Sequence, residues 1–125
     1  MKIELQKPYA FRDIIKYAYD EDFSRIDESF FEGKLLFNKY EIGNESEYLK
    51  KNTIVYIDTL VFEDNENDEY YSNFVINNNL NVICLGEILV DVIGSYKDYK
   101  DELNIDLVLK ALDYYLDNDT FMELD

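Results

Sequence analysis

Residues 81–96 read NVICLGEILVDVIGSY, and within this stretch the apolar pattern changes from that of a strand to that of a helix. The first five residues form a short apolar run that is typical of a buried strand. After Gly86, apolar residues recur at three- and four-residue spacing, which predicts a helix with one buried face and with Glu87 and Asp91 facing outward. The residues expected on the buried face are Ile88, Leu89, Val92, Ile93 and Tyr96.

The flanking segments extend this mixture of strands and helices. On the C-terminal side, Asn104 is predicted to cap a last helix, with Asp106 favourably placed in its first turn. On the N-terminal side, Leu35–Tyr40 and Thr53–Phe62 are rich in β-branched and aromatic residues and are expected to be strands. The residues that the last helix is expected to bury are Ile105, Val108, Leu109, Leu112, Tyr115 and Leu116.

The first third of the chain predicts two further helices. Pro8 suits the first turn of a helix, and apolar residues recur on one face after it, at Phe11, Ile14, Ile15 and Ala18. Ser24–Phe31 is predicted to be a short helix that stops at Gly33. With one proline, no repeat and no linker, residues 1–125 are expected to form a single α+β domain, a small sheet of three to four strands flanked by about three to four helices.

The charge of the chain is strongly unbalanced. It has 28 acidic and 12 basic residues, no histidine, and a net charge of −16. Such a surface is expected to attract a cationic partner and to repel nucleic acid and anionic lipid. Between Asn52 and Tyr96 no lysine, arginine or histidine occurs, and this interval holds the carboxylates of Asp58, Glu63, Asp64, Glu66, Asp68, Glu69, Glu87 and Asp91.

The same composition argues against several kinds of chemistry. The absence of histidine excludes a Ser–His triad and disfavours a zinc site. Asp64, Glu66 and Asp68 alternate as in a calcium loop, but Glu69 stands where glycine is needed and Val75 where the last glutamate is needed. We therefore expect no metal, no cofactor and no enzymatic activity.

Compartment and cysteine usage give weaker expectations. No apolar run approaches the roughly 18 residues that span a bilayer, and the N-terminus lacks the layout of a signal peptide, so a cytoplasmic protein without a membrane partner is expected. The single cysteine, Cys84, lies in an apolar run and is predicted to be a small core residue.

The first predicted partner-binding surface follows the second strand. Glu63–Glu69 consists almost wholly of acidic residues and asparagine and is expected to be an exposed loop, followed by two tyrosines. Tyrosines supply large rigid contact area at interfaces, although an aromatic side chain is also common in a core. The residues proposed for this surface are Glu63, Asp64, Glu66, Asp68, Glu69, Tyr70 and Tyr71.

The second predicted surface is the end of the last helix, formed by Asp113, Asp117 and Asp119. Acidic residues there oppose the helix dipole, which costs roughly 0.3–1 kcal/mol each. One interpretation is that they face a cationic partner. The alternative is that Asn118 takes the left-handed position at the helix end and that the aspartates are solvated or bonded to a neighbouring loop.

One segment also carries a family resemblance. Tyr114–Phe121, preceded by the strand and helix of Asn81–Tyr96, resembles the C-terminal signature of small acidic bacterial proteins that look like immunity proteins of polymorphic or contact-dependent toxin systems. Thr53–Asp58 and Phe74–Leu80 are similar to further segments of that family, so a little over half of the chain is covered. The resemblance implies a binding role and carries over no catalytic residue.

These observations predict an immunity protein that binds and neutralises a cognate bacterial toxin of basic, nuclease type. A second hypothesis is a phosphate-mimicking decoy or anti-defence protein that blocks a nucleic-acid-binding enzyme. A third is a scaffold whose charge serves solubility alone. Only the two binding hypotheses predict that complex formation weakens steeply with salt.

Overall fold

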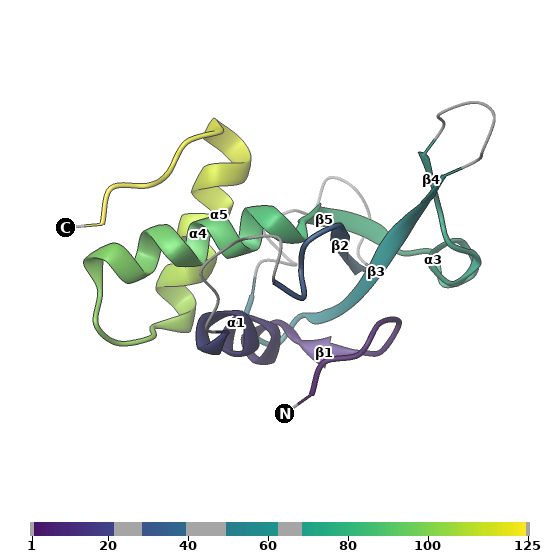
Figure 1. Cartoon of the computed structure of the whole chain (residues 1–125), viewed down its shortest axis with the longest axis horizontal. Coiled ribbons are helices and arrows are strands. Elements are labelled where there is room, and N and C mark those ends of the chain that lie inside the picture. Colours follow the sequence, from purple (N-terminus) through teal and green to yellow (C-terminus); the bar gives the residue numbers. More distant parts are fainter. Residues whose placement is uncertain (1, 22–28, 40–49, 63–68, 125) are drawn as a thin grey trace.

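The computed structural model describes residues 2–21, 29–39, 50–62 and 69–124, whose elements are arranged as in Figure 1. In the described ranges there are five strands and four helices. The strands are β1 (Tyr9–Ala10), β2 (Lys34–Asn38), β3 (Ile54–Phe62), β4 (Glu69–Tyr71) and β5 (Asn81–Leu85). The helices are α1 (Phe11–Asp20), α3 (Asn73–Asn77), α4 (Gly86–Tyr99) and α5 (Ile105–Asn118).

The strands form an antiparallel sheet in the order β1-β3-β2-β5, and β4 pairs with the far end of β3. The register places Leu36 of β2 opposite Ile57 of β3 and Cys84 of β5. This arrangement confirms the predicted α+β class, because the helices are separate from an antiparallel sheet rather than alternating with parallel strands.

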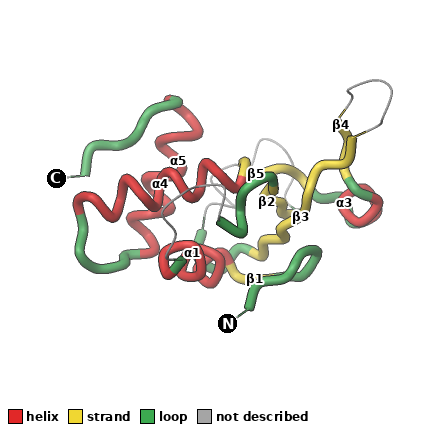
Figure 2. The backbone as a smooth tube through the Cα atoms, viewed as in Figure 1, coloured by secondary structure: helices red, strands yellow, loops and turns green. Residues whose placement is uncertain are grey.

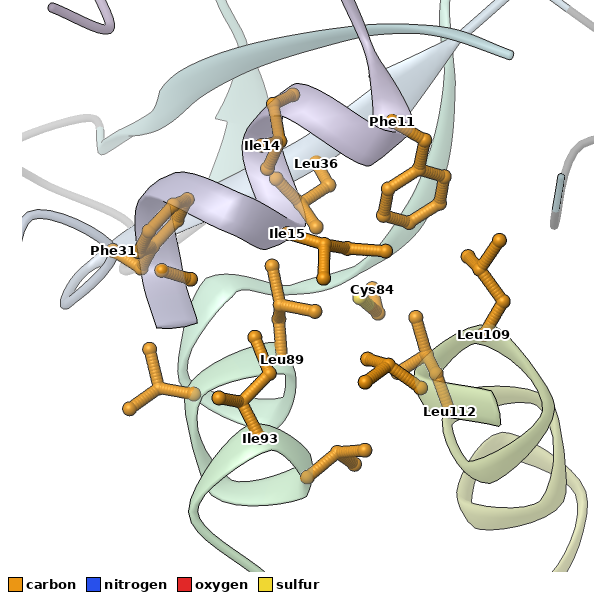
Figure 3. Close-up of a cluster of buried hydrophobic side chains, with 14 of the residues drawn as sticks. Phe11, Ile14, Ile15, Phe31, Leu36, Cys84, Leu89, Ile93, Leu109 and Leu112 are labelled. Carbon is orange, nitrogen blue, oxygen red and sulfur yellow. The ribbon is translucent and has the colours of Figure 1, made fainter. Parts of the chain in front are cut away.

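The two faces of the sheet are covered very differently. Because successive side chains of a strand point to opposite faces, Leu36 packs on one side of β2 while Leu35 and Phe37 pack on the other. The first side carries α1, α4 and α5, whose apolar side chains converge in Figure 3 on Leu36 and Cys84. We call this cluster the helix-side core, and it includes Phe11, Ile14, Ile15, Phe31, Leu36, Val55, Ile57, Cys84, Leu89, Ile93, Leu109 and Leu112.

Among the described residues, the other face of the sheet has only the short helix α3 against it. Four buried residues, Leu35, Phe37, Val75 and Leu80, form what we call the α3-side core. The half-buried rings of Tyr56 and Phe74 pack against it. Figure 2 shows α3 beside the β3–β4 hairpin, toward the end of the long axis opposite α5 and the C-terminal segment.

The helix spacing predicted from the sequence is confirmed for α1, α4 and α5. All four residues expected on the inner face of α1 are buried, and so are Leu89, Val92, Ile93 and Tyr96 of α4. On α5 the buried residues are Val108, Leu109, Ala111 and Leu112. Ile105, Tyr115 and Leu116 on α5 and Ile88 on α4 were also expected to be buried and are only half-buried. None of the helices in the described ranges has the length and apolar character needed to cross a bilayer.

Two predictions near the N-terminus are wrong or lie mostly outside the described residues. Pro8 does not open α1, because Tyr9 and Ala10 are extended and pair with β3 before the helix starts at Phe11. Most of the predicted helix Ser24–Phe31 lies outside the described residues, and its described part, residues 29–31, forms a bend and turn. Gly33 has a φ of 74°, which suits the turn that leads into β2.

The two predicted strands in the middle of the chain are confirmed with adjusted ends. β3 begins at Ile54, one residue after the predicted start, and runs to Phe62 as expected. β2 starts at Lys34 and ends at Asn38, short of the predicted end at Tyr40. Tyr40 itself lies outside the described residues.

Candidate partner-binding surfaces

The first predicted surface lies at the β3–β4 hairpin, which projects from the body of the molecule in Figure 1. Its acidic residues Glu63, Asp64, Glu66 and Asp68 lie outside the described residues. Glu69 was expected in the same loop, but it belongs to β4 and is paired with Phe62 of β3. Tyr70 and Tyr71 complete β4, so the two tyrosines are held by the sheet rather than by a loop.

Asp58 corrects the expectation that all the carboxylates of this region lie on the surface. Its side chain is buried, with the residue only 3% exposed. It accepts hydrogen bonds from Gln6 Nε2 at 3.0 Å, Ser72 Oγ at 2.6 Å and its neighbour's amide, Thr59 N, at 2.8 Å. These donors satisfy a buried charge that would otherwise be costly.

The bond from Ser72 to Asp58 also fixes where α3 begins. Ser72 is the N-cap of α3, and its Oγ accepts a hydrogen bond from Val75 N at 3.3 Å. One hydroxyl therefore links the centre of β3 to the first turn of α3. This linkage orients α3 so that Val75 faces inward and Ile76 faces solvent.

Tyr71 and Ile76 form an exposed apolar pair beside the hairpin. Tyr71 is 41% exposed, and one side of its ring meets Phe37 edge-on with the ring centroids 5.7 Å apart. Ile76 is 57% exposed, and both residues line a shallow hollow together with Lys39 and Asn79. The ring of Tyr71 is thus held by the core on one side and available to a partner on the other, which is how rigid interface anchors are built.

The second predicted surface, at the end of α5, is arranged differently from the expectation. Asp113, Asp117 and Asp119 are all exposed. The left-handed position is taken by Asp119, with a φ of 54°, and not by Asn118. Asn118 is still helical, and its side-chain amide donates to Tyr114 O at 2.9 Å.

The charge environment of Asp113 is mixed. Partial desolvation raises its pKa, and the neighbouring carboxylate of Asp117 raises it further. On its other side, however, Asp113 lines a hollow together with Lys50, Lys51 and Lys110. The three aspartates therefore do not form a surface of one sign, which weakens them as a single binding site for a cation.

The structure does not bring the two predicted surfaces together. Figure 1 places β4 and α5 at separate parts of the long axis, with the sheet between them. The two surfaces are therefore separate candidate contacts. The lysines beside Asp113 leave the hairpin, with Tyr71 and nearby Ile76 exposed, as the stronger candidate for a cationic partner.

The described residues contain no cluster of three or more acidic, cysteine or histidine side chains that could hold a metal ion. The carboxylates that alternate as in a calcium loop, Asp64, Glu66 and Asp68, lie outside the described residues. Cys84 is buried as predicted, and burial raises the pKa of its thiol to about 12. A protonated, enclosed thiol is a packing group rather than a nucleophile.

Sequence reasoning missed several exposed apolar residues, namely Ile76, Tyr99 and Phe121. Ile76 follows a serine cap and stands among asparagines, and this polar context was a signal that a short surface helix was present. Phe121 follows the end of α5 and packs against Tyr115, with the ring centroids 5.1 Å apart and the ring planes tilted by 41°. Nothing in its local pattern indicates that contact.

Comparison with known proteins places most of the chain in one family. Residues 33–124 match the family described as Domain of unknown function (DUF7716). The match begins just before β2 and runs to the C-terminal segment, so it leaves out β1 and α1. No curated protein and no solved structure matches the chain.

Proposed function

We propose that this chain, which belongs to the DUF7716 family, is an immunity protein that binds and neutralises a cationic bacterial toxin through its β3–β4 hairpin. The main support for the proposal is that exposed apolar side chains occur in a part of the sequence whose only charges are negative. The interval between Asn52 and Tyr96 contains no basic residue, and within it Tyr71 and Ile76 are exposed and follow the acidic segment in the sequence.

The two features act at different stages of binding. Long-range attraction by a net charge of −16 accelerates the encounter with a basic protein and is weakened by salt. Once the surfaces meet, burial of Tyr71 and Ile76 slows dissociation, because exposed apolar area is removed from water. An inhibitor of a nuclease needs both, since it must bind before the enzyme reaches its substrate.

The proposal involves no reaction at the hairpin. Carboxylates that occupy a cationic groove replace the phosphates that a nuclease would bind there, so inhibition follows from occupancy alone. Neutralisation is therefore stoichiometric, with one immunity protein consumed for each toxin molecule.

Growth protection tests this function directly. The product of the adjacent open reading frame is expressed in a sensitive host with and without this chain. We expect growth to stop with the neighbour alone and to recover when both are present, and the two proteins to co-purify at low salt. A non-toxic neighbour, or a toxic one from which the chain gives no protection, contradicts the proposal.

Charge reversal then locates the surface. Replacing Glu63, Asp64, Glu66 and Asp68 by lysine is expected to weaken toxin binding by at least about a hundredfold at low salt and to abolish protection. A matched control reverses four carboxylates outside both predicted surfaces and changes the net charge by the same amount. The control residues are Glu32, Asp101, Glu102 and Glu123, all of which are exposed.

Equal losses in the two reversal variants would mean that net charge acts without a defined site, and the hairpin would be excluded. Ile76→Ala tests the apolar part independently, because Ile76 contributes little to the core. We expect it to raise the dissociation rate of the complex about tenfold and to leave the association rate nearly unchanged. If the chain instead inhibits unrelated DNA-binding enzymes and protects against no neighbouring toxin, it is a phosphate-mimicking decoy.

A further inference from the structure

A hollow lies between α1, α4 and the segment that follows α5, away from the hairpin. Its volume is about 510 Å³, which is within the range of ligand-sized clefts. Its rim carries two exposed aromatic side chains, Tyr99 at 64% and Phe121 at 45%. Its apolar floor comes from Ala18, Val90 and Ile93. We call this feature the α4 groove.

Gly94 lines the α4 groove and, because it has no side chain, leaves space there. This glycine is in the middle of a 14-residue helix, where glycine is about 1 kcal/mol less favourable than alanine. A Cβ atom at this position would meet no atom of the described residues within 4 Å, so packing among those residues does not require a glycine. The unused space is what a side chain of a partner would fill when it approaches the backbone of α4.

The charges around the groove specify the chemistry of that partner. Asp91 and Asp98 line it, are exposed, and form no ion pair within the described part of the chain. Glu21 also lines it, but its carboxylate already accepts bonds from Ser29 Oγ and Phe30 N, both at 3.0 Å. Lys97 is the one lysine among the described lining residues, and it lies over the ring of Tyr19 at 4.7 Å from its centroid.

The pKa of Asp91 supports a cationic partner at this position. Partial desolvation raises its pKa, and repulsion from Glu87 one turn earlier raises it further. A lysine or arginine placed beside Asp91 would offset both effects. Apolar floor, aromatic rim and uncompensated carboxylates together describe a site for an amphipathic basic segment.

We propose that the α4 groove docks an amphipathic segment of the cationic partner, with an apolar side chain seated over Gly94 and basic side chains against Asp91 and Asp98. The identity of that partner rests on the proposed function, and the hairpin and the groove would then be two separate contacts with it. Two contacts on one partner raise affinity without either being strong alone.

The test uses a synthetic probe and requires no toxin. A short helical peptide of leucine and lysine, apolar on one face, is titrated into the ¹⁵N-labelled chain, with a leucine–glutamate peptide as the charge control. We expect the lysine peptide to shift the amide signals of Asp91, Gly94 and Ser95, and the glutamate peptide to shift none of them.

Gly94→Leu is the decisive variant, because it fills the groove and should stabilise the helix at the same time. We expect its melting temperature to rise and its affinity for the lysine peptide to fall at least about tenfold. Asp91→Asn with Asp98→Asn should lower the affinity while leaving the groove open. Glu32→Lys, distant in sequence and outside the groove, is the control and should retain nearly all of the affinity.

Three results would overturn the inference: no binding to the wild-type chain, unchanged affinity in Gly94→Leu, or signal shifts confined to residues outside the groove. None of them bears on growth protection, which is measured with the toxin and with hairpin variants. Conversely, loss of protection in the hairpin variants alone does not test the groove, so the two proposals fail separately.

Discussion

The two faces of the sheet differ in how much apolar surface covers them. In the described part of the chain, the helix-side core draws on three helices and on the inward residues of β2, β3 and β5, whereas the α3-side core has four buried residues under a five-residue helix. Because stability follows buried apolar area, most of it is expected to reside on the helix side. The α3 side carries the exposed residues Tyr71 and Ile76, which follow the acidic segment in the sequence.

Because of this difference, the region expected to contribute most of the stability, the helix-side core, is separate from the region proposed to bind the partner, the hairpin. Regions with few buried contacts open at lower free energy than the main core, and interaction surfaces are often found in them. In this chain the division follows from strand parity, since neighbouring residues such as Leu35 and Leu36 serve opposite faces. Changes on one face can therefore be compared with matched changes on the other.

The largest expected contrast comes from one Leu→Ala change on each side. Leu112 is completely buried in the helix-side core, and Leu80 is buried in the α3-side core. We expect Leu112→Ala to lower the free energy of unfolding by about 4 kcal/mol and Leu80→Ala by about 2 kcal/mol, because the thinner cluster collapses more easily around the cavity. Urea denaturation of both variants measures this contrast.

Amide hydrogen exchange of the Leu112→Ala and Leu80→Ala variants shows which part of the chain each substitution destabilises. Leu80→Ala should speed exchange in α3 and β4 while the amides of α4 and α5 remain protected. Equal losses of stability, with exchange accelerated throughout the chain, would mean that the two cores unfold as one unit and that the contrast between the faces has no energetic basis.

The next contrast uses two glycines of α4. A Cβ at Gly86 would contact the carbonyl oxygen of Phe31 and approach Phe31 Cβ to 2.9 Å, while one at Gly94 would meet nothing. We expect Gly86→Ala to cost about 3 kcal/mol through overpacking, and Gly94→Ala to stabilise the chain by about 1 kcal/mol. Thermal unfolding gives both signs, and a destabilised Gly94→Ala would contradict the open groove.

These elements also show how far the sequence could predict the fold. α1, α4 and α5 were predictable because a helix that packs on a sheet must repeat apolar residues on one face, as Phe11, Ile14, Ile15 and Ala18 do. β1 was not predictable, because it is only Tyr9–Ala10 and exists through pairing with Val55 and Ile54. Pro8 was therefore assigned to a helix that starts three residues later.

The candidate sites were less predictable than the fold. Acidic composition identified the hairpin region, but the burial of Asp58 depends on Gln6 and Ser72, which are 52 and 14 residues away in sequence. The lysines beside Asp113 include Lys50 and Lys51, which precede β3 and reach α5 only in the folded chain. Charge patterns report composition along the chain, whereas a site depends on which distant residues meet.

A smaller contrast is expected between two helix caps. Ser72 caps α3 and also donates to buried Asp58, while the side chain of Asn104 caps α5 by accepting from Leu107 N at 3.1 Å. Ser72→Ala should cost about 2 kcal/mol, since it removes a cap and a donor to a buried carboxylate, and Asn104→Ala about 1 kcal/mol. Ser72→Thr, which keeps the hydroxyl, should recover most of the loss.

The ranking of the two caps can be contradicted by denaturation measurements. If Asn104→Ala costs more than Ser72→Ala, the hydrogen bond to Asp58 contributes little, and the position of α3 depends on the contacts of Val75 instead. The orientation of Ile76 at the proposed hairpin surface would then rest on packing alone.

The smallest expected effect is a pH dependence of the free energy of unfolding, caused by one aspartate on each of two helices that pack in the helix-side core. The pKa values of Asp91 on α4 and Asp113 on α5 are raised from 3.8, mainly by partial desolvation, so ionisation of either group disfavours the folded state. Their protonated forms therefore add stability that is fully present below pH 3.8 and is lost as the pH rises through the raised pKa values.

The variant Asp91→Asn with Asp113→Asn should be more stable than the wild type at pH 7, and this advantage should shrink as the pH falls through the raised pKa values of the two aspartates. An advantage that stays constant with pH would mean that the substitutions act through packing or helix propensity and not through charge, and the inferred need of Asp91 for a cationic neighbour would lose its electrostatic support.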